Sequence, residues 1–483
     1  IGGLSGDAIT TGHSNTTLGV SSLGINTTGI YNLALGVSAL ESNTTASYNT
    51  AVGSRSLEDN STGANNTAVG YVALGANTTG DGNTAMGAFA LDSNTTGTQN
   101  VAVGGAALDA NTTASNNTAV GYYALLANTT GDRNVAVGTE ALDANTTANA
   151  NTAVGYQSLS ANTTAEVNTA IGFSTLRLNT TGGANTAVGA GALDANTTAS
   201  YNTAVGYYAL VSNTTGTFNT AVGGSAGDAL TTGSENVAVG YNALSAEDTG
   251  VGNVAIGRNA LAALNYDGSG YNTAVGYIAG STITTGIQNT FVGALAGDGT
   301  DDGASNVAVG YGALSANAGD HNTSLGANAG NLVTGAYNTC LGSGSGEKIA
   351  AGNTNICIGG AAGGEITTGD NNIMMGYLAG RHGVNLATGA ANILIGSYAD
   401  TTATDSSYAT VIGYTTIGQN TSDIRAAHGT ATWATVSDER YKKDIVDSTA
   451  GLSFINALQP RTFKYKNLGD LPEAFSAYEA DST

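Results

Sequence analysis

The sequence predicts an all-β fold, a parallel β-solenoid of about 25 stacked turns with a 17-residue period, and three observations agree on it. The segment Asn49-Thr50-Ala51-Val52-Gly53 recurs at a constant spacing, beginning again at Asn66, Asn83 and Asn100. Proline accounts for only 2 of 483 residues, which suits strands that need every backbone N–H group. The apolar residues of the repeat are small or β-branched, and Asn-Thr-Thr-Gly turns bound them.

One glycine marks each turn, and we call it the marker glycine. Marker glycines follow one another at a constant step from Gly2 through Gly19 and Gly36 to Gly257, and at slightly variable steps from there to Gly413. A constant short period is typical of a solenoid, in which each turn buries its apolar face only against its neighbours. Each turn should advance the stack by ~4.8 Å, the spacing of hydrogen-bonded strands.

Two positions in the turn exchange volume with each other. The fourth residue after the marker glycine is leucine where the seventh is asparagine, as in Leu57 with Asn60. The fourth residue is glycine where the seventh is aliphatic, as in Gly227 with Leu230. We expect no turn to mix these two registers, because a close-packed interior has room for one large side chain. Both positions should therefore point into the same core space.

The recurring strand is apolar on both of its faces. The residue before the marker glycine is aliphatic or methionine, as in Val52 and Met86, and the residue before that one is also apolar, as in Ala51. Adjacent strand residues face opposite sides. One side faces the interior of the turn, and the other needs a second surface, for which another copy of the chain is the simplest source. The pattern predicts a homo-oligomer.

The net charge limits the kinds of molecule that the chain could bind, and the distribution of its basic residues marks a boundary in the chain. The net charge of −22 argues against binding to nucleic acid or to anionic membranes, and no apolar run is long enough for membrane insertion. Six of the thirteen Lys and Arg residues and both prolines lie close to the C-terminus, in residues 440–472. We place the fibre in residues 1–418, a neck or linker in 419–436, and a small α+β segment in 437–483.

The repeat resembles the head repeats of trimeric autotransporter adhesins and, more closely, the repeat arrays of phage tail-fibre-like proteins. The pattern that carries this resemblance is Asn-Thr-Ala-Val-Gly-x-x-Ala-Leu-x-x-Asn-Thr-Thr-Gly, and it covers roughly residues 1–413. The resemblance implies that the solenoid is left-handed and that the oligomer is a homotrimer.

A second resemblance begins where the repeat ends. The run Ser-Asp-Glu-Arg-Tyr-Lys-Lys-Asp-Ile, residues 437–445, resembles the opening of the intramolecular chaperone domain of phage endosialidases and tail fibres. The resemblance implies a segment that helps three chains to trimerise and then cuts itself off between Val436 and Ser437. It assigns Ser437 as the nucleophile and Lys442, by its spacing from the serine, as the base. A lysine can activate a serine hydroxyl if burial lowers its pKa.

Several other patterns have two interpretations. The Asn-x-Thr sequons that recur once per turn from Asn26 to Asn213 could carry glycans, but we favour an internal ladder of asparagine side chains. Cys340 and Cys357 share one register, so they could form a disulfide, although small buried side chains are our preferred interpretation. Tyrosines that follow marker glycines could form a sugar-binding stripe or simply cover the strand edge; they include Tyr71, Tyr122, Tyr156 and Tyr207.

An acidic loop is the last such pattern. Its members, Asp298, Asp301 and Asp302, could hold calcium, but we favour a solvated turn. The four histidines are scattered without metal-ligand spacing. We therefore expect no metal and no cofactor.

Together these patterns predict a structural extracellular fibre or adhesin that presents or spaces a receptor-binding surface, on a virion tail fibre or a cell surface. The expected partners are two further copies of the chain and a cell-surface glycan or protein receptor. We expect no enzyme activity apart from self-cleavage by Ser437 and Lys442. Two alternatives stay open. One is a polysaccharide-degrading tailspike, which would need paired carboxylates. The other is a self-assembling cell-surface filament with an N-glycosylated asparagine ladder.

Overall fold

The computed structural model describes residues 2–381, 386–401, 403–412, 424–427 and 434–435. These residues form strands, turns and bends, and no helix occurs among them. The chain divides into two units, Ile1–Val436 and Ser437–Thr483. The second unit, for which we expect a small α+β segment, lies outside the described residues.

Almost all strands of the first unit are three residues long, and each turn contains one of them. Their bounds are β1 Thr16–Leu18, β2 Leu33–Leu35, β3 Thr50–Val52, β4 Thr67–Val69, β5 Thr84–Met86, β6 Val101–Val103, β7 Thr118–Val120, β8 Val135–Val137, β9 Thr152–Val154, β10 Thr169–Ile171, β11 Thr186–Val188, β12 Thr203–Val205, β13 Thr220–Val222, β14 Val237–Val239, β15 Val254–Ile256, β16 Thr273–Val275, β17 Thr290–Val292, β18 Val307–Val309, β19 Thr323–Leu325, β20 Thr339–Leu341, β21 Ile356–Ile358, β22 Ile373–Met375, β23 Ile393–Ile395, β24 Ala409–Ile412, β25 Ile424–Ala427 and β26 Ala434–Thr435.

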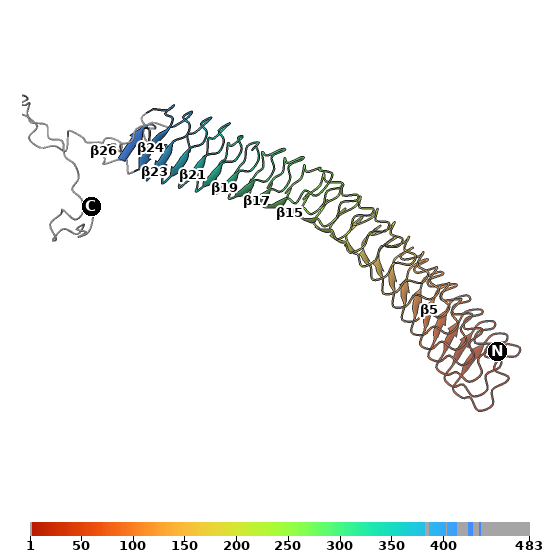
Figure 1. Cartoon of the computed structure of the whole chain (residues 1–483). Coiled ribbons are helices and arrows are strands. Elements are labelled where there is room, and N and C mark those ends of the chain that lie inside the picture. The colour runs from red at the N-terminus through yellow and green to blue at the C-terminus, as the bar shows by residue number, and fades with distance from the viewer. Residues whose placement is uncertain (1, 382–385, 402, 413–423, 428–433, 436–483) are drawn as a thin grey trace, which may run out of the picture. The chain divides into compact units, whose positions relative to one another are not determined.

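Strands β1 to β24 form one parallel sheet in which each strand pairs with the next one in the chain (Figure 1). The register follows the repeat, so that Val52, Val69 and Met86 lie on successive rungs. This confirms the predicted parallel β-solenoid with one turn per repeat, although β1 to β24 enclose 23 turns rather than about 25. The hand of the winding stays a prediction. Two antiparallel strands, β25 and β26, follow within residues 419–436, where we expected a neck or linker.

Backbone hydrogen bonds join successive turns well beyond the short strands. Within one turn, Arg55 N–H donates to the Val37 carbonyl of the turn before (2.9 Å), and Leu57 N–H donates to the Ala73 carbonyl of the turn after (3.0 Å). The pattern repeats along the stack. The whole turn therefore behaves as one rung, and its backbone polar groups are satisfied by the rungs on either side.

The marker glycine makes the corner at which each strand ends. Gly53 has φ = +138°, a conformation that side chains rarely adopt, and a Cβ atom there would meet the carbonyl group of Gly70 in the next turn. The same close approach recurs from one marker glycine to the next. Both the conformation and the lack of space require glycine, which explains why the period of the repeat is most visible at this residue.

The core is a continuous column of small and aliphatic side chains that runs through the stack. In the Leu–Asn register, both Leu57 and Asn60 are completely buried. In the Gly–aliphatic register, Leu230 lies over Gly227, with its Cδ1 atom 3.0 Å from where a Cβ on that glycine would be. The two positions thus share one space, as the volume exchange predicts.

The expectation that no turn mixes the two registers is wrong. Leu261 and Leu264 are the fourth and seventh residues after Gly257, and both are completely buried. Room for the pair comes from the next turn, which has Gly280 at its fourth position. The Cδ2 atom of Leu261 lies 3.0 Å from the site of a Cβ on Gly280. Volume is therefore balanced between neighbouring turns as well as within each turn.

Candidate functional sites

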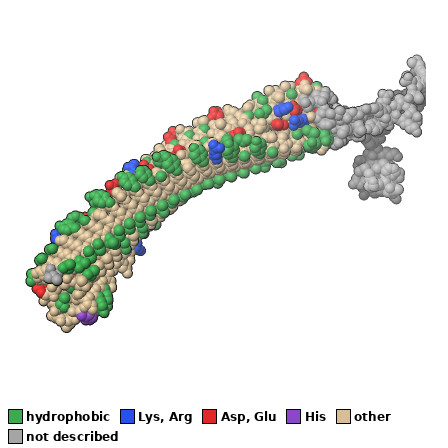
Figure 2. Space-filling view, turned by 180° about the vertical axis from the view of Figure 1, so that it is seen from behind, with side chains coloured by type: hydrophobic (Ala, Val, Ile, Leu, Met, Phe, Trp, Pro, Cys, Tyr) green, Lys and Arg blue, Asp and Glu red, His purple; other side chains and the backbone are tan. Residues whose placement is uncertain are grey.

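The outer face of the parallel sheet is the largest candidate interaction surface. We use the name outer sheet face for the first and third residues of strands β1 to β23, together with Thr410 and Ile412 of β24. From β2 to β23 the middle residues, such as Ala51, point inward and are buried, whereas third residues such as Met86, Ile171 and Leu341 are between 39% and 44% exposed. Hydrophobic side chains gather in long rows along the stack (Figure 2).

Two properties indicate that the outer sheet face is covered by another surface. It contains no charged residue from β1 to β24, although the chain has a net charge of −22. In addition, parallel sheets occur almost only where both faces are packed against other elements. One face of this sheet packs on the interior of the turns, and the described residues provide no cover for the other. Extended rows of exposed hydrophobic side chains are typical of protein interfaces.

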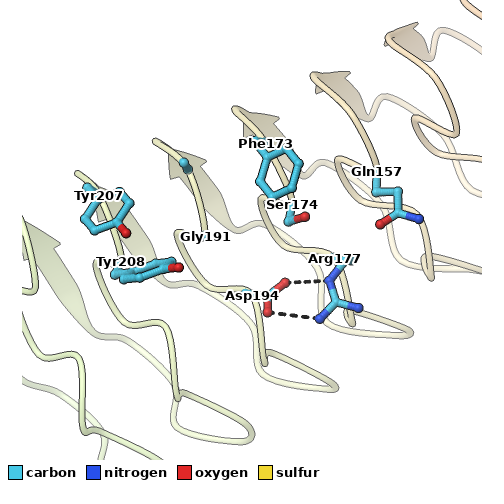
Figure 3. A pocket seen from close by; sticks show the side chains of 9 residues that line it. Gln157, Phe173, Ser174, Arg177, Gly191, Asp194, Tyr207 and Tyr208 are labelled. Carbon is cyan, nitrogen blue, oxygen red and sulfur yellow. Dashed lines mark hydrogen bonds and ion pairs between the residues drawn. The ribbon is translucent and has the colours of Figure 1, made fainter.

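A pocket with a volume of about 520 Å³ lies after the marker glycines of four successive turns (Figure 3). Phe173 and Tyr207 each directly follow a marker glycine, and their side chains are 60% and 59% exposed. In the turn between them, the residues that follow the marker glycine are Ala190 and Gly191, and both line the pocket. The ring of Tyr208 covers Gly191, where a Cβ atom would clash with it. The base of the pocket is therefore Ala190 and the Tyr208 ring over Gly191, and Phe173 and Tyr207 stand at its sides.

Polar groups occupy the other side of the same pocket. Arg177 donates two hydrogen bonds to the Asp194 carboxylate, from Nε (2.9 Å) and from a terminal nitrogen (3.1 Å) (Figure 3). Gln157 donates from Nε2 to Glu140 (2.7 Å), which fixes the direction of its amide. Because Arg177 and Asp194 are the charged residues in the lining, the pocket is close to electrically neutral.

A smaller pocket of about 230 Å³ near the N-terminal end of the stack also combines aromatic rings with an arginine–carboxylate pair, and its lining adds two further carboxylates, Asp59 and Asp92. Its aromatic residues are Tyr71 and Phe89, whose rings meet edge to face with centroids 5.4 Å apart. Beside them, Arg55 donates from Nε to Glu58 (2.6 Å). Tyr71 and Phe173 both directly follow marker glycines, six turns apart. The combination of exposed rings with an arginine–carboxylate pair therefore occurs twice on the solenoid.

The sequon asparagines form a buried ladder. Asn128 donates from Nδ2 to Asn111 Oδ1 (3.0 Å) and to the Gly131 carbonyl (3.0 Å), and it accepts from Asn145 Nδ2 (2.8 Å). The equivalent residues from Asn26 to Asn213 are completely buried. The structure thus places these amides in the core, as in the internal-ladder interpretation, where a glycan attached to Nδ2 has no room.

A second buried ladder precedes the strands and was not identified from the sequence. Asn49 N–H donates to Asn32 Oδ1 (3.0 Å), and Asn49 Nδ2 donates to the Gly63 carbonyl (2.9 Å). This asparagine begins every Asn-Thr-Ala-Val segment, so its recurrence in the repeat could have predicted the second ladder. The two ladders share an acceptor, because Asn60 Nδ2 also donates to Gly63 (2.9 Å).

The remaining candidates are placed as follows. Cys340 and Cys357 pair directly on adjacent strands, and both are buried free thiols. Asp301 accepts a hydrogen bond from the Thr284 hydroxyl (2.5 Å). Among the described residues, no group of three or more His, Cys, Asp or Glu side chains could hold a metal ion. Ser437 and Lys442 lie outside the described residues, so their mutual geometry stays a prediction.

The comparisons with known proteins bear on the C-terminal segment. Residues 437–478 match the family model described as the chaperone of endosialidase. Neither the curated proteins nor the solved structures include a significant match to this chain. Within the described part of the chain, no helix has the length and apolar character needed to cross a membrane.

Proposed function

We propose that this chain is one of three identical subunits of an extracellular structural fibre, similar to a tail fibre, that presents or spaces a receptor-binding surface. The observation that carries the proposal is the uncharged outer sheet face along β1 to β24, in which a row of aliphatic and methionine side chains runs beside a row made mostly of threonines. Three such faces, packed together around a common axis, would cover one another. The match of residues 437–478 to the chaperone of endosialidase supports the trimer, because the C-terminal segment would assist its assembly.

The C-terminal segment has a second role in this proposal. Once three chains have assembled, Ser437 Oγ attacks the Val436 carbonyl carbon while Lys442 takes the hydroxyl proton and passes it to the departing Ser437 amine. This step replaces the peptide bond by an ester between Val436 and the Ser437 side chain, and hydrolysis of that ester by water releases the chaperone segment. A fibre without its chaperone cannot easily refold after unfolding, so its persistence depends on a slow unfolding rate. The polysaccharide-degrading alternative has less support, because Asp194, the carboxylate of the larger pocket, is already paired with Arg177.

The test of the trimer is the mass of the native particle, measured for the wild type and for Val137→Glu. Val137 is the third residue of β8 and lies on the outer sheet face. We expect a trimer for the wild type and a shift to monomers or aggregates for the variant, since three carboxylates would meet in the interface. Thr147→Glu is the matched control, because Thr147 is exposed in the same turn but lies away from the strand. A stable wild-type monomer would overturn the proposal.

A further inference from the structure

The larger pocket combines three features that together select one class of ligand. It is open to solvent, it presents the faces and edges of aromatic rings, and its polar groups come as a neutral arginine–carboxylate pair with a nearby amide (Figure 3). Its volume of about 520 Å³ falls within the ~300–1,000 Å³ that is usual for small-ligand sites.

The aromatic rings suit the apolar face of a sugar ring. Phe173, Tyr207 and Tyr208 are between 43% and 60% exposed, so part of each ring is open to a ligand. Phe173 and Tyr207 lie two turns apart, a separation of roughly 10 Å at one strand spacing per turn. The ring of Tyr208 packs on Gly191 within this gap, so a sugar ring would lie over Ala190 and the exposed part of the Tyr208 ring, with Phe173 and Tyr207 at its sides.

The polar groups suit hydroxyls rather than a charged group. The Arg177 guanidinium and the Asp194 carboxylate offer donors and acceptors side by side, which matches the paired donor and acceptor functions of neighbouring hydroxyls. A phosphate or a carboxylate would instead need an uncompensated cation, and Arg177 is already compensated by Asp194. The net charge of −22 further disfavours anionic ligands.

We propose that the pocket between Phe173 and Tyr207 binds a neutral saccharide, whose ring packs on the aromatic side chains while its hydroxyls bind Arg177, Asp194 and Gln157. This inference deepens the proposed receptor-presenting role and rests on it for its biological meaning. The site itself lies within one chain. Its residues follow the marker glycines, where the strand has ended, and so they are not part of the outer sheet face.

The test uses the full chain and a panel of neutral oligosaccharides built from hexoses and N-acetylhexosamines, with sialyllactose as the anionic probe. Binding is measured on an array and then by titration calorimetry. We expect binding to at least one neutral oligosaccharide, and a loss of affinity of about tenfold or more in Phe173→Ala and in Tyr207→Ala. Phe218→Ala is the matched control, since it removes an equally exposed ring elsewhere on the turn. It should leave the affinity unchanged.

The ligand preference of an Asp194 variant gives a second measurement, and this preference would not change if Asp194 had only a structural role. Asp194→Asn leaves Arg177 without its counter-charge, so this variant should lose affinity for the neutral ligand and gain affinity for sialyllactose. The saccharide site is overturned if no neutral oligosaccharide binds, or if Phe173→Ala and Tyr207→Ala bind as the wild type does. Native mass is measured on the same samples. Monomers that still bind the sugar would overturn the trimeric fibre and leave the saccharide site standing.

Discussion

The side chain of Leu230 fills the space beside Gly227 that a leucine at the fourth position of the turn would otherwise occupy. A Cβ on Gly227 would lie 3.0 Å from Leu230 Cδ1 and 3.1 Å from Leu210 Cδ2 of the turn before. The backbone of Gly227 has φ = +58°, close to the +50° of Leu57, so a leucine could adopt the conformation. The two registers therefore have the same backbone conformation. They differ in whether the fourth or the seventh position of the turn bears the large side chain.

This relationship predicts the outcome of exchanging the registers. Gly227→Leu alone should destabilise the chain by about 1–3 kcal/mol through overpacking. Leu230→Asn alone should cost about 2–5 kcal/mol, because it removes a buried side chain beside a glycine. The double variant should recover much of both losses. Its new asparagine could also donate to Asn213 Oδ1, which is buried without a hydrogen-bond partner in the described part of the chain. Thermal unfolding of the four proteins measures the coupling. Additive losses would contradict shared packing.

The sequence alone could predict the solenoid, its period and the shared core space, because each depends on residues that recur at fixed spacing. It could not reveal that a third position, the middle residue of the strand, takes part in this exchange of side-chain volume. The Phe291 ring occupies the place where side chains at Gly280 and Gly297 would lie, and Met374 does the same at Gly380. Phe291 and Met374 each lie near the fourth-position glycines of two successive turns, so these contacts depend on how the turns stack. The larger pocket could not be predicted from the sequence either, because its lining comes from the residues of four turns.

The buried asparagine ladder predicts a large effect from a small change. Asn128→Ala should leave the Asn111 oxygen, the Asn145 amide and the Gly131 carbonyl each short of one hydrogen bond. Leaving a buried polar group unsatisfied costs about 1–3 kcal/mol. The expected result is a clear drop in the free energy of unfolding or, if unfolding is irreversible, faster thermal inactivation.

Thr130→Ala provides the matched control for this prediction. It abolishes the same Asn-x-Thr sequon, but Thr130 is exposed and its side chain lies outside the ladder. We expect Thr130→Ala to be as stable as the wild type. Equal destabilisation by the two variants would mean that the sequon, through an attached glycan, matters more than the hydrogen bonds of Asn128.

The half-buried carboxyl group of Asp143 predicts a pH dependence. Burial raises the pKa of Asp143 from its ordinary 3.8 to about 6, and its Oδ1 atom is buried without a hydrogen-bond partner in the described part of the chain. At pH values between these two pKa values, the folded chain therefore binds more protons than the unfolded chain does. Stability is highest below the unfolded-state value and falls as the pH rises through this window.

Asp143→Asn should remove this dependence. The variant should be more stable than the wild type near pH 7, and the difference should shrink toward zero at about pH 4. Unfolding temperatures measured at pH steps between these limits check the sign. Asp7→Asn, at an exposed carboxyl group, controls for the loss of one negative charge. A wild type that gains stability relative to Asp143→Asn as the pH rises would contradict the argument.

Self-cleavage at Val436 and Ser437 is the prediction with the most direct chemical test. The Ser-Asp-Glu-Arg-Tyr-Lys run stands where the repeat composition ends and where the match to the chaperone of endosialidase begins. A serine hydroxyl becomes a useful nucleophile only when a base removes its proton, and Lys442 can do so if burial lowers its pKa. The chain, expressed with its chaperone segment, should therefore yield a product that ends at Val436, identified by intact mass.

The variants separate cleavage from assembly. Ser437→Ala and Lys442→Ala should each abolish the product ending at Val436, while native mass still reports trimers, because the chaperone segment acts in assembly before it is cut off. Lys443→Ala is the matched control, since it removes the same charge one residue further along, and it should cleave as the wild type does. If Ser437→Ala still releases the segment, the serine is not the nucleophile and an external protease becomes the better explanation. If Lys443→Ala fails to cleave while Lys442→Ala succeeds, the base has been assigned to the wrong lysine.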